Sequence, residues 1–326
     1  MPLPFILGGL ALAAAGYGVK KGIDALDADC EADEFIKKAE SLKEEAAKKV
    51  KLAQSDRNLA LARFGEKKLR VLSHSVSNFL DHFHRLNRST ITIEGINMQD
   101  IQYQVSDARK ITNQLNANGI DGDSVLGVFA SYGGLCVSGW TTGAMLGGGL
   151  TMGGLAGMAV FGGLVAVPVL AILGAVSASE MEEKLEKAKA YHSQVEEAVK
   201  KADVIIDQFQ AIEKMAKLFT RQIAKCDALL FLLSQDAIAT MKKHNYDTSR
   251  YNQKEKDQLC VTVSTLSSLS AFLKVPIIDE HQKLNKKAQE ALNLMRGQMD
   301  ALESGQKSGH YNVAMIQSNQ KGLKNL

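Results

Sequence analysis

The chain has 326 residues, of which 39 are Lys or Arg and 36 are Asp or Glu, giving a formal net charge of +3. So small a positive excess, with no basic cluster interleaved with aromatic residues, argues against a nucleic-acid-binding surface. Only 4 Pro and 1 Trp occur, while Ala, Leu, Lys, Glu and Gln dominate long stretches. This composition is typical of long helices. The sequence therefore predicts an all-α fold, an elongated helical bundle or coiled coil with a glycine-rich apolar helical hairpin in mid-chain.

The first region, residues 1–22, is apolar from Pro2 to Val19 and continues into Lys20 and Lys21. A secretory signal would carry its positive charge before the apolar run. We therefore interpret this region as a retained, membrane-seeking helix. Its apolar part would be about 27 Å long at 1.5 Å per residue, which is marginal for a membrane span. A signal peptide of unusual form is the alternative.

Residues 23–123 are predicted to be an amphipathic helical region. From Ala32 to about Arg88, apolar residues recur at intervals of three and four, with Lys and Glu on the other faces. A short link rich in β-branched residues follows, and a second helix is predicted from Met98 to Leu115. Asn-Gly and Asp-Gly pairs then end the helical pattern.

Residues 124–179 carry the most unusual feature of the sequence. The 56 residues between Asp123 and Glu180 include no Asp, Glu, Lys, Arg or His. A soluble helix rarely has more than about twenty such residues in a row, because one face usually meets water. The length fits two membrane-spanning arms, Val125–Leu146 and Leu150–Ala178, joined by a glycine turn. The alternative is a central hairpin buried in a soluble bundle. The two interpretations can be combined if the hairpin is buried in a soluble form first and inserts into the membrane later.

Glycines in this segment are spaced by four residues, which stacks them on one face of a helix. The predicted membrane-packing residues form two rows, Gly139, Gly143 and Gly147, then Gly149, Gly153 and Gly157. A face without side chains allows another helix to approach closely, and such packing works in lipid. Each Gly also costs about 1 kcal/mol of helix stability relative to Ala. The segment is therefore expected to be labile in water, which favours conditional insertion.

Residues 180–303 are predicted to form long coiled helices, the first from Glu180 to about Lys243. One position repeats every seven residues from Ala188 onward, a spacing typical of a packing seam between helices. The predicted seam comprises Leu185, His192, Val195, Val199, Ala202, Ile206 and Phe209. Because His192 is the titratable member, its protonation could destabilise the seam at low pH.

Beyond Lys243, helices are predicted over Gln253–Leu273 and from Ile278 to about Leu302, with a break at Pro276. Residues 304–326 are rich in Gly, Ser, Asn, Gln and Lys. They are predicted to be a flexible basic tail, either solubilising or attracted to an anionic membrane.

Motifs for enzyme chemistry are missing. The sequence has no phosphate-binding loop with its lysine, no GxSxG and no HExxH. The densest polar group could hold a metal or sense pH, but polar residues flanking an apolar stripe explain it better; it consists of His74, Asp81, His82 and His84. Cysteines are far apart, which predicts reduced thiols in an intracellular protein; they are Cys30, Cys136, Cys226 and Cys260. We predict no enzyme, cofactor or metal.

In the order of its parts, the sequence resembles the α-pore-forming proteins of the cytolysin A type. Both have an apolar N-terminal helix, long amphipathic helices, an apolar hairpin and further long helices. The glycine-rich hairpin between charged helices is also similar to the membrane-insertion region of apolipoprotein L-type proteins. The resemblance is one of architecture, so no site residues are transferred. It implies insertion and oligomerisation, as in a bacterial self-targeting or defence effector acting on the inner membrane from within.

We therefore expect a homo-oligomeric helical protein that inserts into the lipid bilayer and forms a pore or disrupts the membrane, as a toxin or defence effector does. It is expected on the cytoplasmic side of the inner membrane, with a soluble cytoplasmic form before insertion. The alternative is a non-lytic, membrane-anchored coiled-coil scaffold whose long helices bind a partner protein or shape the membrane. A soluble bundle with a glycine-rich core is a third interpretation.

Overall fold

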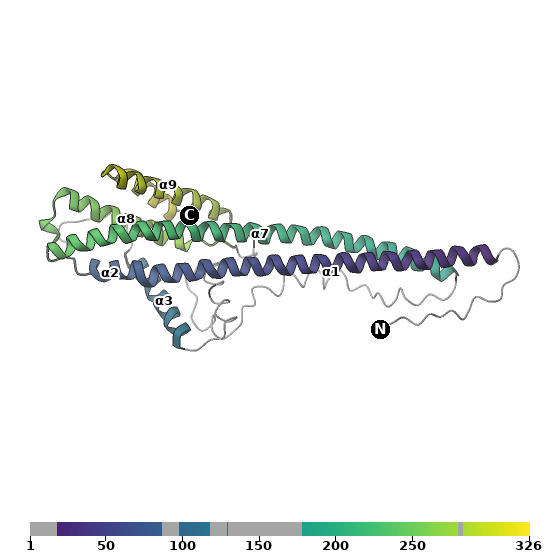
Figure 1. The fold of residues 1–326 in the computed structure, drawn as a ribbon. Coiled ribbons are helices and arrows are strands. Elements are labelled where there is room, and N and C mark those ends of the chain that lie inside the picture. Colours follow the sequence, from purple (N-terminus) through teal and green to yellow (C-terminus); the bar gives the residue numbers. More distant parts are fainter. Residues whose placement is uncertain (1–17, 87–97, 118–128, 130–177, 280–282) are drawn as a thin grey trace. The chain divides into compact units, whose positions relative to one another are not determined.

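The computed structural model describes residues 18–86, 98–117, 129, 178–279 and 283–326, and these residues are almost entirely helical (Figure 1). No β-strand occurs among them. In chain order the elements are α1 (Gly18–Arg70), η1 (Val71–Val76, a π-helical stretch), α2 (Ser77–Phe83), α3 (Met98–Ala117), α7 (Ala178–Lys243), η3 (Thr248–Arg250), α8 (Gln253–Lys274), α9 (Lys286–Ser308) and α10 (Val313–Lys324). The predicted all-α class is thus confirmed. The apolar N-terminal stretch up to residue 17, and nearly all of the predicted hairpin with its six zipper glycines, lie outside the described residues.

The break between the helices α8 and α9 is longer than the sequence suggested. The predicted helix from Ile278 begins instead at Lys286, because the backbone first folds back on itself. Ile278 and Leu284 pair in an isolated antiparallel bridge, and the amide of Asn285 donates to the carbonyl of Ile277 at 2.8 Å. The Asn285 side chain then accepts from the amide of Lys287 at 3.0 Å and caps α9.

Residues 304–326 differ from the predicted flexible tail. The helix α9 continues to Ser308, where Gly309 takes a left-handed conformation with φ of 72° and ends it. The Asn312 side chain caps α10, and Ile316 and Leu323 of α10 are buried against the rest of the core. The composition is polar overall, but these two apolar residues lie seven apart, on one face of the helix. That face is enough to order the segment.

The described residues fall into two compact units. The described part of unit 1 is residues 18–54 and 178–207, and that of unit 2 is residues 55–86, 98–117, 129, 208–279 and 283–326. The helices α1 and α7 each contribute residues to both units. In the described part of unit 1, the first portions of α1 and α7 lie side by side (Figure 1). All the shorter helices belong to unit 2.

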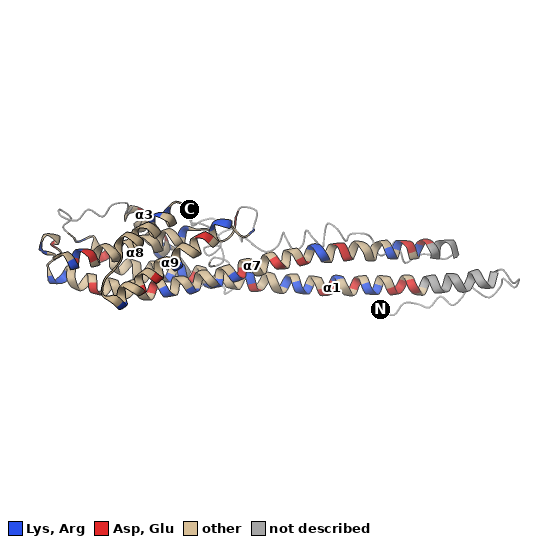
Figure 2. Ribbon diagram, turned by 90° about the horizontal axis from the view of Figure 1, so that it is seen from above, with Lys and Arg blue, Asp and Glu red and all other residues tan. Residues whose placement is uncertain are grey.

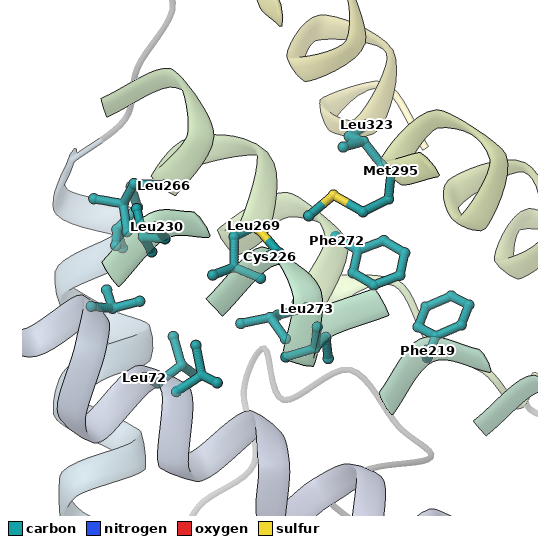
Figure 3. Close-up of a cluster of buried hydrophobic side chains, with 14 of the residues drawn as sticks. Leu72, Phe219, Cys226, Leu230, Leu266, Leu269, Phe272, Leu273, Met295 and Leu323 are labelled. Carbon is teal, nitrogen blue, oxygen red and sulfur yellow. The ribbon is translucent and has the colours of Figure 1, made fainter. Parts of the chain in front are cut away.

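The helix α8 lies at the centre of the hydrophobic core of unit 2. Every residue from Val261 to Ser270 is buried, so no face of this stretch meets water. Figure 3 shows Leu269 and Phe272 of α8 in one cluster with Cys226 of α7 and Met295 of α9. The Phe272 ring stacks on that of Phe219, with their centroids 4.4 Å apart. Such all-round burial explains why α8 shows no clear amphipathic pattern.

Many of the buried residues of α8 are Ser or Thr, and three of their hydroxyls find a partner within the helix. Thr262, Thr265 and Ser268 each donate to the carbonyl four residues earlier, at 2.8–2.9 Å. This local bond removes the cost of burying a hydroxyl without a partner. A sequence of mixed polarity can therefore occupy the centre of a bundle.

Candidate functional site

Small side chains bring α1 and α7 together in unit 1. On α1, Ala32, Ala39 and Ala46 recur every seven residues and are buried. On α7, Ala188 and Val195 occupy the facing seven-residue position and are also buried. Since 3.6 residues complete one turn, a seven-residue repeat keeps these residues on one narrow face. We call residues 18–54 of α1 and 178–207 of α7, which form this contact, the α1–α7 pair.

Polar contacts across the pair fix its direction. The Lys184 ammonium donates to Asp33 Oδ1 at 3.0 Å, and the Tyr191 hydroxyl donates to the Glu40 carboxylate. The partners in each contact are 151 residues apart in sequence, and the two contacts lie seven residues apart on both helices. A constant separation of this kind requires the two helices to run parallel. The chain segments that precede Gly18 and Ala178 therefore join the pair at the same end.

One member of each polar contact is sheltered from water. The Lys184 side chain is only 8% exposed although it carries an ammonium group, and a buried charge requires a partner such as Asp33. The Tyr191 ring is buried too; burial raises the pKa of its hydroxyl, and the hydrogen bond to the Glu40 carboxylate raises it further. The hydroxyl thus stays protonated and remains a donor to Glu40. These contacts fix the register of the two helices, since a shift by one turn would leave the buried Lys184 ammonium without its carboxylate partner.

The structure divides the predicted seam into two groups. Val195, Ala202 and Phe209 are buried, whereas Leu185, His192, Val199 and Ile206 are only half-buried. The second core position lies one residue earlier than predicted, at Tyr191 and Ala198. A heptad allows steps of three or four, and the step from Ala188 here is three. The sequence offered one signal for this position, the seven-residue spacing of Tyr191 and Ala198, but their polar and small side chains make it weak.

His192 lies at the edge of the α1–α7 pair and not in its centre. Its ring meets the Phe35 ring edge-on, with the centroids 5.5 Å apart, and its Nδ1 lies 3.6 Å from a Glu196 carboxylate oxygen. Phe35 is also contacted by the ammonium groups of Lys38 and Lys189. A protonated His192 would have Glu196 beside it, so the structure offers a charge partner that the low-pH hypothesis did not include.

Outside its core the α1–α7 pair is densely charged. Lys and Arg alternate with Asp and Glu along both helices (Figure 2). Several Glu residues precede a Lys by four positions, the orientation that stabilises a helix; these pairs are Glu34–Lys38, Glu44–Lys48, Glu45–Lys49, Glu183–Lys187 and Glu197–Lys201. Such faces favour contact with water.

The polar group suggested as a metal or pH-sensing site is not brought together. His74 Nδ1 lies 2.9 Å from the Ser73 hydroxyl, His82 Nδ1 lies 2.8 Å from the Tyr246 hydroxyl, and His84 contacts Gln102. Asp81 faces Arg109 at 3.4 Å. Across the part of the chain that the structure describes, no three His, Cys, Asp or Glu side chains are grouped to hold a metal ion.

Two further results bear on function. No helix within residues 18–86, 98–117, 178–279 and 283–326 combines the length and the apolar character needed to cross a membrane. Comparisons with models of known protein families, with curated proteins and with solved structures found no match.

Proposed function

We propose that the chain is a membrane-inserting, oligomerising helical protein that forms a pore or disrupts the bilayer, with the α1–α7 pair as its water-exposed stem. The observation that carries the proposal is the parallel direction of the pair. It joins two apolar sequences, Pro2–Val19 and the uncharged segment between Asp123 and Glu180, to the same end of one charged stem. Antiparallel helices would have separated the two sequences.

Physical chemistry favours insertion of both sequences from one side of a bilayer. An uncharged stretch of the length needed to span the hydrocarbon core gains free energy on leaving water. The charged faces of α1 and α7 would remain outside, because a charge at the bilayer centre costs several kcal/mol. One end of the stem would thus lie at the membrane surface, with both apolar sequences entering the same leaflet.

The finer architecture belongs to the same proposal. The chain would be an elongated bundle whose mid-chain segment forms a glycine-zipper hairpin, with Gly143 and Gly153 in the helix contacts that hold the oligomer in lipid. The soluble form would exist in the cytoplasm before insertion into the inner membrane. Neither a cofactor nor nucleic acid is required.

Dye leakage from liposomes tests the proposal. Purified full-length protein is added to vesicles of phosphatidylethanolamine and phosphatidylglycerol, and release is compared for wild type, Gly143→Leu and Gly153→Leu. The matched control is Ala144→Leu, which adds the same side chain one position away from the glycine row. We expect leakage from wild type and the control, and at least tenfold slower leakage from the two glycine variants.

Three outcomes would contradict parts of the proposal. Equal leakage by all variants would remove the glycine rows from the mechanism. Tight membrane binding without any leakage would favour a non-lytic scaffold. Absence of both membrane binding and leakage would refute membrane insertion altogether.

The scaffold remains the second candidate because of one feature of unit 2. Phe231 and Leu232 of α7 are adjacent, large and apolar, yet 49% and 48% exposed. Exposed apolar side chains that lie together mark protein-binding surfaces more often than isolated ones do. Pull-down of a partner by wild type but not by a Phe231→Ser, Leu232→Ser variant, together with absence of leakage, would support the scaffold.

A further inference from the structure

Unit 2 contains a cavity of about 410 Å³ between α3, α8 and α10. This volume falls in the range of small-molecule sites in proteins. Its apolar walls come from separate elements: Ile101 from α3, Ala271 from α8, Val275 after α8, and Leu323 from α10. A mainly apolar interior of this size suits a short hydrocarbon chain.

Two buried hydroxyls of α8 face this cavity. The Gln104 amide donates to Ser270 Oγ at 2.6 Å, and the Gln320 amide donates to Ser267 Oγ at 3.2 Å. Accepting these bonds occupies an oxygen lone pair and leaves each hydroxyl hydrogen able to donate. Both serines are therefore available as donors to an acceptor in the cavity.

The charged side chains that line the cavity include more ammonium groups than carboxylates. Lys274, Lys324 and Asp100 line the same cavity, and Lys274 pairs with Asp100. Burial lowers the pKa of Lys324, an effect that the nearby Asp100 opposes and Lys274 reinforces. Among the side chains of the lining, two ammonium groups thus face one carboxylate; Leu326 also lines the cavity, and its main-chain oxygen accepts from the Lys287 ammonium. An anion placed beside the lysines would reduce the cost of keeping both charged.

We propose that this cavity binds a single-chain amphiphile with a compact anionic head, the head held by Lys274, Lys324 and the Ser270 hydroxyl and the alkyl chain lying on Ile101 and Leu323. Both alkyl carboxylates and alkyl phosphates have this chemistry. The site lies entirely within unit 2, and its binding does not depend on membrane insertion by the proposed hairpin.

Calorimetric titration of the full-length protein tests this site. The probes are decanoate, decyl phosphate, decanol and inorganic phosphate, each kept below its micelle concentration at pH 7.5. We expect saturable binding of one decanoate or decyl phosphate per chain, the tighter of the two identifying the head group. Decanol and inorganic phosphate should bind at least about tenfold more weakly, because decanol lacks the anionic head and inorganic phosphate lacks the alkyl chain. A tenfold loss of affinity corresponds to the loss of one good contact.

Variants locate the binding. Lys324→Gln should weaken decanoate binding about tenfold, and Ala271→Phe should abolish it by filling the cavity. The matched control is Lys321→Gln, because Lys321 lies on the same helix and is exposed like Lys324 but does not line the cavity. Circular dichroism verifies folding of each variant. Equal affinity for decanol and decanoate, unchanged affinity in Lys324→Gln, or absence of saturable binding would overturn the site.

Discussion

Asp33 and Lys184 form an ion pair of 3.0 Å across α1 and α7, and the lysine of this pair is almost fully buried. Together with the Tyr191–Glu40 bond seven residues further on, it fixes the two helices as parallel and in one register. Heptad spacing alone is compatible with both directions. The direction matters because it joins both apolar sequences to one end of the stem.

A charge exchange tests this ion pair. Asp33→Lys and Lys184→Asp should each lower the free energy of unfolding by about 1–2 kcal/mol, because each places like charges side by side and leaves one of them sheltered from water. Combining the two substitutions should recover part of the loss, measured by urea unfolding as a double-mutant cycle. Glu34→Lys is the control, since its exposed pair with Lys38 contributes little. Strictly additive effects would contradict the parallel pairing.

Glu255 predicts an acid-sensitive contact at the turn between α7 and α8. Its carboxylate lies 3.0 Å from His244 Nε2, accepts from the main-chain amide of Asn252 and pairs with Lys243. These contacts lower the pKa of Glu255 from 4.5 to about 2, with the contact to His244 contributing most. A lowered pKa in the folded state means that the stabilisation is complete above about pH 4.5 and disappears as the pH falls toward 2.

Glu255→Gln should therefore lower Tm at pH 7, and the difference from wild type should shrink between pH 4.5 and 2. Thermal unfolding at several pH values measures this effect. Glu290→Gln, an exposed residue of α9, serves as the control. A difference in Tm that stays constant across the acid range would show that the ionised carboxylate is not what stabilises the turn.

Two glycines of α9 should respond in opposite ways to Ala. At Gly305 an added Cβ would overlap the Tyr311 ring, so Gly305→Ala should cost about 1–3 kcal/mol of stability by overpacking. At Gly297 the nearest atom, of Asn319, would be 3.6 Å away in ordinary contact. Gly297→Ala should therefore stabilise by up to about 1 kcal/mol. The two variants would be compared by their denaturant midpoints. Equal changes in midpoint would refute packing of Tyr311 on α9.

The helix α10, which the sequence predicted to be part of a flexible tail, should contribute to stability because it is buried against the core. Ile316→Ala should lower the free energy of unfolding by about 2–5 kcal/mol, because Ile316 is fully buried. Met315→Ala, at the adjacent and exposed position, should change it by less than about 0.5 kcal/mol. Limited proteolysis gives a second readout, with faster cleavage after residue 308 in the Ile316 variant. Early cleavage there in wild type would contradict the packing of α10.

Helical structure could be predicted because it depends on near neighbours. The seven-residue repeat through α7 lies within the helix that it specifies, and the last residues of α7 and α8 are within one residue of those predicted. Local signals failed where distant contacts decide. Ile278 begins no helix because Leu284 pairs with it, and the tail is ordered because α8 and α9 offer Ile316 an apolar surface.

The same distinction holds for the candidate site. By itself the sequence determined that the chain is helical, that its helices carry charged outer faces, and that residues 124–179 are free of charge. Only the tertiary structure decided that α1 and α7 are parallel, that Tyr191 and not His192 enters the core, and that Lys274 and Lys324 share one cavity. A heptad states which face of a helix is apolar, but not which helix covers it or in which direction. Those choices rest on contacts such as Lys184 with Asp33, whose partners are 151 residues apart.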